Sequence, residues 1–245
     1  MLFLGFIVFL AFLTEAIVGF GSVIITVTLG AHVLGIDALL ARFLPLNLLL
    51  SALLLVRAGG LVEGRLIGRF LLPPVGVGMG LGLLLARYQA GPWLRLAFGV
   101  FVVLLAAIEL GRLLRDAPPP TSPRPALDFG LLVLGGLVHG LFGTGGPVVV
   151  YVLSRRIPER GAMRATLAAL WVMLNTLLLG SFVAQDKLSS STLRDSLMLL
   201  PSLVLGLTLG ERLHHQLPER PFRWMVYLVL LLAGGSLTVR TLLQG

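Results

Sequence analysis

Residues 139–147 read His-Gly-Leu-Phe-Gly-Thr-Gly-Gly-Pro, a glycine-rich break between two apolar stretches. Glycine permits backbone conformations closed to other residues, and proline suits the first turn of a helix. The stretch therefore predicts a helix that ends before the glycines and a second helix that begins at the proline. The start of a helix presents free N–H groups and the positive end of the helix dipole, which together favour an anion. The candidate anion-binding residues here are Gly143, Thr144, Gly145 and Gly146.

This pattern occurs a second time near the start of the chain. Residues 15–22 read Glu-Ala-Ile-Val-Gly-Phe-Gly-Ser and align with residues 139–146. Three further matches follow in order: Asn47 with Asn175, residues 71–73 with 199–201, and residues 91–93 with 220–222. Because the order and spacing persist, the sequence predicts two related halves. We expect repeats at residues 1–115 and 129–245, joined by a proline-rich linker at 116–128 that cannot be helical.

The composition is that of a membrane protein. Hydrophobic residues make up 57% of the 245 positions and charged residues 12%, whereas soluble domains carry roughly 25% charged residues. Mean hydropathy is +0.99. Backbone polar groups inside a bilayer must be satisfied internally, so the apolar runs are expected to be helices. The predicted fold class is an all-α polytopic membrane protein.

Charge and motifs exclude several classes of function. The net charge is +8, but the arginines lie in short loops between apolar runs, where they set orientation, so we expect no nucleic-acid partner. The chain has no cysteine, and no set of ligands with metal spacing occurs. Nucleotide-binding loops, zinc-protease pairs and nucleophile elbows are missing. The chain is therefore expected to be no enzyme and to hold no cofactor and no metal.

Each half contains five apolar segments, of which the last three are long enough to span a bilayer. The first two are short and are separated by the glycine break. If each break folds the chain back as a hairpin, 13 basic residues fall on one face and six on the other. The six are Arg42, Arg87, Arg95, Lys187, Arg194 and Arg240. If each broken pair crosses the membrane instead, the count is 9 against 10.

Cytoplasmic loops are enriched in basic residues, so the hairpin arrangement is favoured. Each half then comprises a broken, re-entrant helical hairpin plus three transmembrane helices, and the two halves are inverted. Both termini are expected outside the cell and the linker at 116–128 in the cytoplasm. Inverted halves with broken helices are typical of secondary transporters, whose substrate sites lie near mid-membrane.

The first glycine cluster supplies a second set of candidate substrate-binding residues. They are Gly19, Gly21 and Ser22, with Ser22 as the hydroxyl donor that matches Thr144. An alternative for both clusters is that the glycines only permit tight helix packing.

Ionisable and amide side chains also recur in equivalent positions. Glu15 and His139 each precede a glycine cluster by four residues, and an ionisable residue inside an apolar segment is by default a functional hypothesis. They are candidates for proton coupling; alternatively, they pair with each other or cap a hairpin turn. Asn47 and Asn175 are candidates for substrate binding, with hydrogen bonding between helices as the alternative.

With these two clusters the chain resembles the sulfite exporter TauE/SafE family of membrane permeases, over about residues 1–114 and 127–243. The second cluster and Tyr151 carry the more specific match. The first cluster departs from the commoner triple-glycine form through Phe20 and Ser22. The resemblance implies a permease of the cell inner membrane that moves sulfite, sulfoacetate or another small organic anion, usually outward.

The sequence thus favours a secondary transporter of a small anion that works by alternating access. Two alternatives stay open: an uncoupled anion channel or facilitator, and a non-transporting membrane scaffold subunit. The expected partners are the lipid bilayer and the small anionic substrate, and a homodimer is a candidate assembly.

Overall fold

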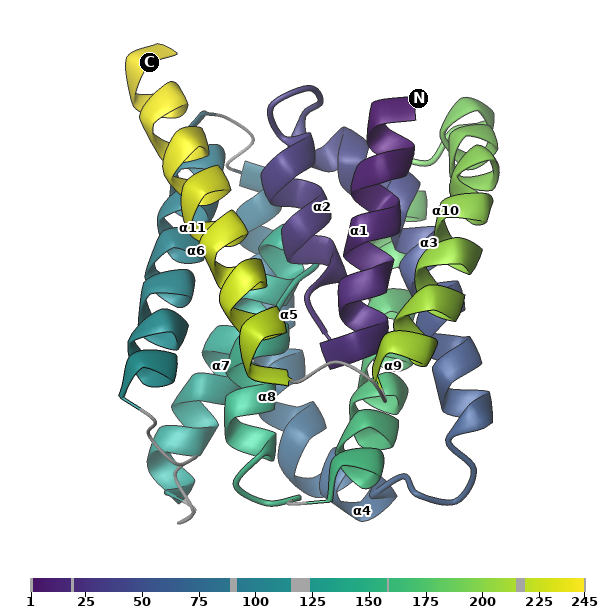
Figure 1. Cartoon of the computed structure of the whole chain (residues 1–245), viewed down its shortest axis with the longest axis vertical. Coiled ribbons are helices and arrows are strands. Elements are labelled where there is room, and N and C mark those ends of the chain that lie inside the picture. Colours follow the sequence, from purple (N-terminus) through teal and green to yellow (C-terminus); the bar gives the residue numbers. More distant parts are fainter. Residues whose placement is uncertain are drawn as a thin grey trace. The chain divides into compact units, whose positions relative to one another are not determined.

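The structure is a computed structural model that describes residues 2–18, 20–88, 92–115, 124–157, 159–214 and 219–244. Within these ranges the chain is helical and contains no strand (Figure 1). The helices are α1 (Leu2–Val18), α2 (Ser22–Gly30), α3 (Ile36–Arg57), α4 (Gly64–Leu66), the π-helical turn η1 (Ile67–Leu71), α5 (Leu72–Tyr88), α6 (Pro92–Leu114), α7 (Pro125–Phe142), α8 (Gly146–Leu153), α9 (Arg160–Ala184), α10 (Ser190–His214) and α11 (Glu219–Gln244).

Seven helical segments in the described ranges are long and apolar enough to cross a membrane. They are Ile36–Arg57, Gly64–Ala86, Leu96–Leu114, Pro125–Phe142, Gly161–Ala184, Ser190–Leu213 and Trp224–Leu243. Their outward faces carry exposed aliphatic side chains such as Leu205 and Leu232, which suit contact with lipid. The prediction of an all-α multi-pass membrane protein is confirmed.

The described residues contain one candidate span more than the six that the sequence predicted, and the additional span is α7. α7 has 18 residues because it begins at Pro125, inside the expected linker 116–128. Proline is favoured at the first helical position, where its missing N–H costs nothing. Residues 116–123 of the predicted linker lie outside the described residues. Residues 125–128 form the first turn of α7, so the expectation that the linker is not helical is wrong for these four residues.

The two helix breaks occur at the predicted glycines. Gly143 ends α7 with a φ of 68°, and Gly21 precedes α2 with a φ of 104°. Both values lie in the left-handed region, where a side chain is disfavoured. Gly19 lies outside the described residues.

The α7–α8 segment folds back on itself as a hairpin. A Cβ atom on Gly145 would overlap the backbone carbonyl of Gly135, so the chain after the break runs closely along α7. At the open end, Asp128 in the first turn of α7 forms ion pairs with Arg155 and Arg156, which directly follow α8. The two ends of this hairpin therefore lie on the same side.

The α1–α2 segment has the same form. The two helices pack against each other, and Figure 1 shows the N-terminus and the turn after α2 at the same end. With nine and eight residues, α2 and α8 extend only about 12–13 Å, well short of the roughly 30 Å hydrocarbon core. Each hairpin therefore has a long first leg and a short return leg.

The described chain forms two compact units, and each unit combines segments of both halves. Unit 1 comprises Met1–Leu39, Gln89–Pro118 and Leu199–Gly245, and it holds α1, α2, α6, α11 and most of α10. Unit 2 comprises Leu40–Tyr88 and Pro119–Met198, and it holds α5, α7, α8, α9 and most of α3. The division into repeats at 1–115 and 129–245 is a division of the sequence, and the inverted orientation of those repeats stays a prediction.

In unit 2 the long hairpin leg α7 packs tightly on α5, which belongs to the fourth apolar segment of the other half. A Cβ on Gly78 of α5 would overlap the carbonyl of Val133 in α7 and lie 2.8 Å from the N atom of Leu137. A Cβ on Gly82 would overlap the carbonyl of Leu137. The two backbones touch directly, as small residues allow between membrane helices.

Unit 1 repeats this contact with the equivalent residues. A Cβ on Gly206 of α10 would lie 2.8 Å from the carbonyl oxygen of Phe9 and 3.0 Å from the N atom of Leu13. A Cβ on Gly210 would lie 2.9 Å from the carbonyl oxygen of Leu13. The internal repeat seen in the sequence thus appears as one helix contact made twice, each time between segments of different halves.

A carboxylate caps α9, the third helix of the second half. Glu159 precedes α9 and accepts hydrogen bonds from the N–H groups of Gly161, at 2.8 Å, and Ala162. These bonds, with that of Ala162 the larger cause, hold the pKa of Glu159 below its ordinary value. This cap fixes where α9 begins after the turn that follows the α7–α8 hairpin.

Candidate functional site

The tip of the α7–α8 hairpin is built as the sequence predicted. The N–H of Gly143 donates to the carbonyl of His139 at 2.7 Å, which closes α7. Gly145 caps α8 without a side-chain hydrogen bond, and Pro147 occupies the first turn. The N–H groups at the start of α8 therefore point out of the helix without intrahelical partners.

The residues of this tip are buried. Thr144 is 5% exposed, and Gly145 and Gly146 are also buried. Gly145 lies so close to α7 that its Cβ would sit 3.3 Å from the Cβ of His139. The alternative of tight packing therefore holds for Gly145, whereas Gly21 has open space around it and is required by its backbone conformation.

His139 lies in the last turn of α7 and is 2% exposed. Its ring stacks on Trp171 of α9, with centroids 5.7 Å apart and planes inclined by 11°. Neither ring nitrogen has a hydrogen-bond partner among the described residues. A buried imidazole with both nitrogens unpartnered is costly, so this position is more than ordinary packing.

The two predicted asparagines meet in unit 2. Nδ2 of Asn175 donates to Oδ1 of Asn47 at 2.6 Å, and both residues are at most 4% exposed. They come from equivalent helices, α3 and α9, so this contact joins matching positions of the two repeats. This bond is the hydrogen bond between helices that the sequence analysis gave as the alternative to substrate binding. Oδ1 of Asn175 has no partner in the described part of the chain.

Helix α9 connects these groups. Trp171 and Asn175 are four residues apart on α9 and share one face. His139 stacks on Trp171, and a Cβ atom on Gly145 would lie 3.3 Å from the Cβ of His139. Unit 2 therefore brings together the second glycine cluster, the imidazole and both asparagine amides.

Unit 1 holds the counterparts from the first hairpin. Glu15 in α1 is 3% exposed, and Ser22 at the start of α2 is fully buried. Gly21 lies directly before Ser22 in the left-handed conformation. The first hairpin thus carries a buried carboxyl group and a hydroxyl group at its tip.

The buried ion-pair cluster at the base of the α7–α8 hairpin was missed in the sequence. Asp128 is fully buried and the Arg155 side chain is 1% exposed; Arg156 lies 3.1 Å from Asp128. Arg155 also lies over the ring of Tyr151, at 4.6 Å, and Arg156 over the ring of Phe70, at 3.6 Å. The sequence assigned Asp128 to the linker and counted the arginines only as determinants of orientation, although a hairpin requires its two ends to meet.

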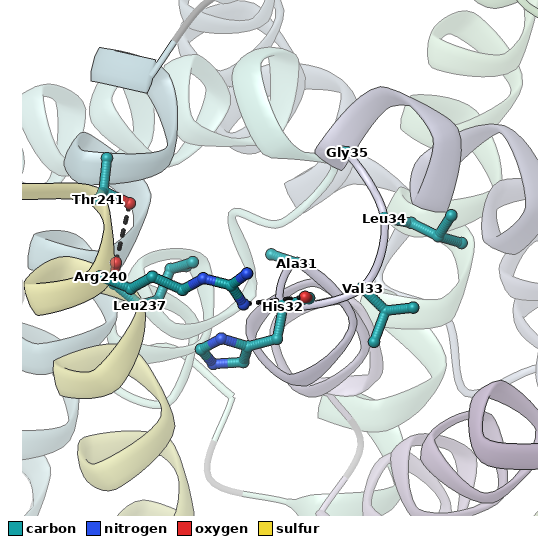
Figure 2. A pocket seen from close by; sticks show the side chains of 8 residues that line it. All are labelled: Ala31, His32, Val33, Leu34, Gly35, Leu237, Arg240 and Thr241. Carbon is teal, nitrogen blue, oxygen red and sulfur yellow. Dashed lines mark hydrogen bonds between the residues drawn. The ribbon is translucent and has the colours of Figure 1, made fainter. Parts of the chain in front are cut away.

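A surface pocket of about 170 Å³ lies in unit 1, between the turn after α2 and the end of α11. Arg240 donates to the carbonyl of His32 at 3.0 Å across this pocket (Figure 2). None of the candidate site residues lines it. The pocket is therefore separate from the predicted anion site.

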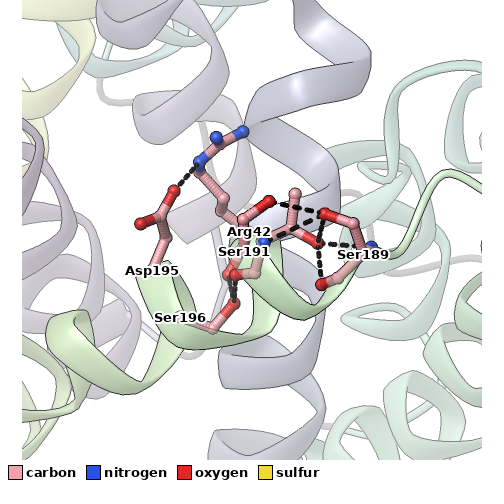
Figure 3. Close-up of polar contacts among 6 residues, drawn as sticks. Arg42, Ser189, Ser191, Asp195 and Ser196 are labelled. Atoms are coloured by element: carbon pink, nitrogen blue, oxygen red, sulfur yellow. Dashed lines mark hydrogen bonds and ion pairs between the residues drawn. The ribbon is translucent and has the colours of Figure 1, made fainter.

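A second polar cluster ties α3 to the start of α10 in unit 2 (Figure 3). Arg42 forms an ion pair with Asp195 at 2.8 Å, and Ser196 donates to the carbonyl of Arg42 at 2.7 Å. Ser189 and Thr192 bond each other at the first turn of α10. Arg42 lies on α3, the helix of Asn47, but its side chain pairs with Asp195 of α10 and not with the asparagines.

The fold and the buried polar groups at the broken hairpins define a multi-pass helical membrane protein of the transporter type. A family model described as sulfite exporter TauE/SafE matches residues 4–237, and the chain belongs to this family. Over 182 residues the chain is 27% identical to the "Probable inner membrane transporter protein TsaS" of Comamonas testosteroni, a match that covers 72% of this chain and 73% of that protein. No solved structure matches the chain.

Proposed function

We propose that this membrane transporter is a secondary exporter of a small oxyanion, with sulfite, sulfoacetate or another organosulfonate as substrate. The observation that carries the proposal is the cluster in unit 2. In unit 2 the start of α8 presents N–H groups without intrahelical partners, the buried imidazole of His139 stacks on Trp171, and the two asparagine amides bond to each other. Hydrogen-bond donors to a charged acceptor contribute about 1.5–3 kcal/mol each, so a few of them suffice to hold an anion away from water.

The proposed binding residues come from both hairpin tips and both asparagine helices. They are Gly19, Gly21, Ser22, Asn47, Gly143, Thr144, Gly145, Gly146 and Asn175. The glycine backbones and the start of each short helix supply N–H donors, and Ser22 and Thr144 supply hydroxyl donors. The proposed depth of the substrate site is near mid-membrane, as in other transporters built from repeats.

Glu15 and His139 are the proposed proton carriers. Both are buried near a hairpin tip, and both change charge on taking up a proton. Protonation of Glu15 removes a negative charge that would repel the anion. Binding of a proton therefore favours binding of the anion. Rocking of one part of the protein against another would then expose the site alternately to each side.

The proposed location is the inner membrane, with both termini outside and the linker 116–128 in the cytoplasm. The name of the similar TsaS protein supports the inner membrane, and the excess of basic residues on one predicted face supports the orientation.

The test is uptake of labelled sulfite or sulfoacetate into proteoliposomes that hold a pH gradient. Secondary transport predicts accumulation above the external concentration, which collapses when a protonophore removes the gradient. Flux that only equalises the two concentrations identifies an uncoupled channel, and no flux with any of the anions identifies a scaffold subunit.

A variant pair locates the site in the same assay. Asn175→Ala is expected to lower uptake about ten-fold or more, because a buried amide that faces the anion is removed. Thr176→Ala is the matched control, since Thr176 is the next residue on α9, is exposed, and donates to the carbonyl of Val172. Equal uptake by both variants would contradict the proposed role of Asn175.

A further inference from the structure

Among the buried polar atoms of unit 2 without hydrogen-bond partners are Oγ of Ser51, Oδ1 of Asn175 and both ring nitrogens of His139. Oδ1 of Asn175 only accepts, so it would take a protonated group, whereas the hydroxyl of Ser51 can donate to an anion. Buried polar groups in proteins are almost always hydrogen-bonded, so each such atom calls for a partner. Ser51 did not stand out in the sequence, because its counterpart in the second half is Leu179.

Ser51 belongs with the asparagine pair by position and burial. It lies one helical turn after Asn47 on α3, on the same face, and is 1% exposed. A serine in a helix usually bonds to the carbonyl four residues earlier, and here it does not. Its hydroxyl is therefore available to a solute that reaches Asn47 and Asn175.

None of the residues assigned to the site carries a fixed positive charge. Arg42, on the helix of Asn47, is ion-paired with Asp195, and Arg155, which follows α8, is ion-paired with Asp128. The donors that remain are hydroxyl, amide, imidazole and backbone N–H groups. Apart from a transported proton on His139, the site therefore offers neutral hydrogen bonds and no fixed cation.

This composition restricts the charge of the anion. The cost of moving an ion out of water grows with the square of its charge, so a doubly charged ion costs roughly four times as much as a singly charged ion of equal size. Neutral donors offset the cost of one charge far more readily than that of two.

Building on the proposed function, we infer that the site selects singly charged oxyanions and that Ser51 is a further binding residue. Within the proposed substrates this narrows the choice to bisulfite, monosulfonates and sulfoacetate with a protonated carboxyl group, and it disfavours doubly charged sulfite, sulfate and ionised sulfoacetate.

The test compares ions whose charge does not change with pH. Thermal shift of the purified protein and competition for uptake in proteoliposomes would be measured with methanesulfonate and ethanesulfonate against methanedisulfonate. The expected result is that both monoanions bind and that the dianion binds at least about ten-fold more weakly. Ethanesulfonate controls for size.

The outcomes separate this inference from the proposal beneath it. Equal binding of methanedisulfonate overturns the selectivity for one charge and leaves anion transport intact. Absence of binding and flux with every anion, sulfite and sulfoacetate included, overturns the proposed function itself.

Ser51→Ala tests the new residue. The apparent affinity for methanesulfonate is expected to fall about three- to ten-fold, while the melting temperature without anion is unchanged or higher, since an unpartnered buried hydroxyl is removed. Ser196→Ala is the control, because its hydroxyl already bonds to the carbonyls of Arg42 and Thr192. That variant is expected to lose stability without a change in affinity. Unchanged affinity in Ser51→Ala removes Ser51 from the site.

Discussion

The two hairpins occupy equivalent positions in the repeat but are stabilised in different ways. The α7–α8 hairpin is tied at its base by the buried Asp128 between Arg155 and Arg156. The α1–α2 hairpin begins with residues 1–5, which contain no charged side chain. Its short leg instead buries hydroxyl groups at Thr26 and Thr28, where α8 has valines.

This difference indicates that the two copies have diverged in opposite directions. The second hairpin is held at the base by charge and has an apolar return leg. In its described residues the first hairpin shows no cluster like that of Asp128, and its return leg contains buried polar groups. The ion pairs of Asp128 stabilise the α7–α8 hairpin and make it the more rigid of the two. The unpartnered hydroxyl groups in α2 reduce the stability of the α1–α2 hairpin, because buried polar groups without partners are costly.

The largest effect is expected from Asp128→Ala, which breaks the base of the second hairpin. Arg155 would then be buried without a counter-charge, and loss of one member of a buried ion pair typically costs about 3–5 kcal/mol. The thermal unfolding midpoint of the purified protein should fall sharply. Glu109→Ala is the control, because Glu109 pairs with Arg112, whose side chain is 39% exposed, and exposed pairs contribute about 0–1 kcal/mol. Similar midpoints for both variants would show that Asp128 does not hold the hairpin.

The next effect concerns the contact between each long hairpin leg and its partner helix. A Cβ on Gly140 of α7 would overlap the carbonyl of Met79 and lie 2.9 Å from the N atom of Leu83. The equivalent residue in α1 is Ala16, whose Cβ is accommodated opposite Gly210. Gly140→Ala is therefore expected to cost about 1–3 kcal/mol, because backbone atoms must move apart.

The reverse change at the equivalent position sharpens the comparison. Ala16→Gly removes one fully buried methyl group and adds backbone freedom, with an expected cost of about 1 kcal/mol. The unfolding midpoint of Gly140→Ala should therefore lie below that of Ala16→Gly. The opposite order would mean that α5 and α7 can separate more easily than their close approach suggests.

Local features of the fold were predictable from the sequence, because they depend on nearby residues. The apolar runs set the helices, and Gly21 and Gly143 set the breaks through backbone conformations that only glycine adopts readily. The sequence identified Asn47 and Asn175 as equivalent positions, with hydrogen bonding between helices as one alternative, and in the structure the two side chains bond to each other.

Contacts between distant segments were not predictable in the same way. The repeat did not reveal that each long hairpin leg packs on a helix of the other half, as Gly78 on Val133 and Gly206 on Phe9 do. The ion pair of Asp128 with Arg155 was not predicted, because Asp128 follows a proline-rich stretch and was assigned to the linker. Arg155 was counted only among the basic residues that determine the orientation in the membrane. The stacking of His139 on Trp171 joins residues that no local pattern connects.

A small effect of the opposite sign, a gain in stability, is expected from Thr26→Val. Thr26 is 1% exposed and its hydroxyl has no partner among the described residues, while the equivalent position in α8 is Val150. Valine keeps the shape of threonine and removes the unsatisfied group, so the free energy of unfolding should rise by about 1 kcal/mol. Thr14→Val is the matched control, since Thr14 donates to the carbonyl of Leu10 at 2.8 Å and should lose a bond instead. A lower unfolding midpoint for Thr26→Val would show that this hydroxyl is satisfied in the folded protein, and the contrast between the two return legs would then be one of sequence alone.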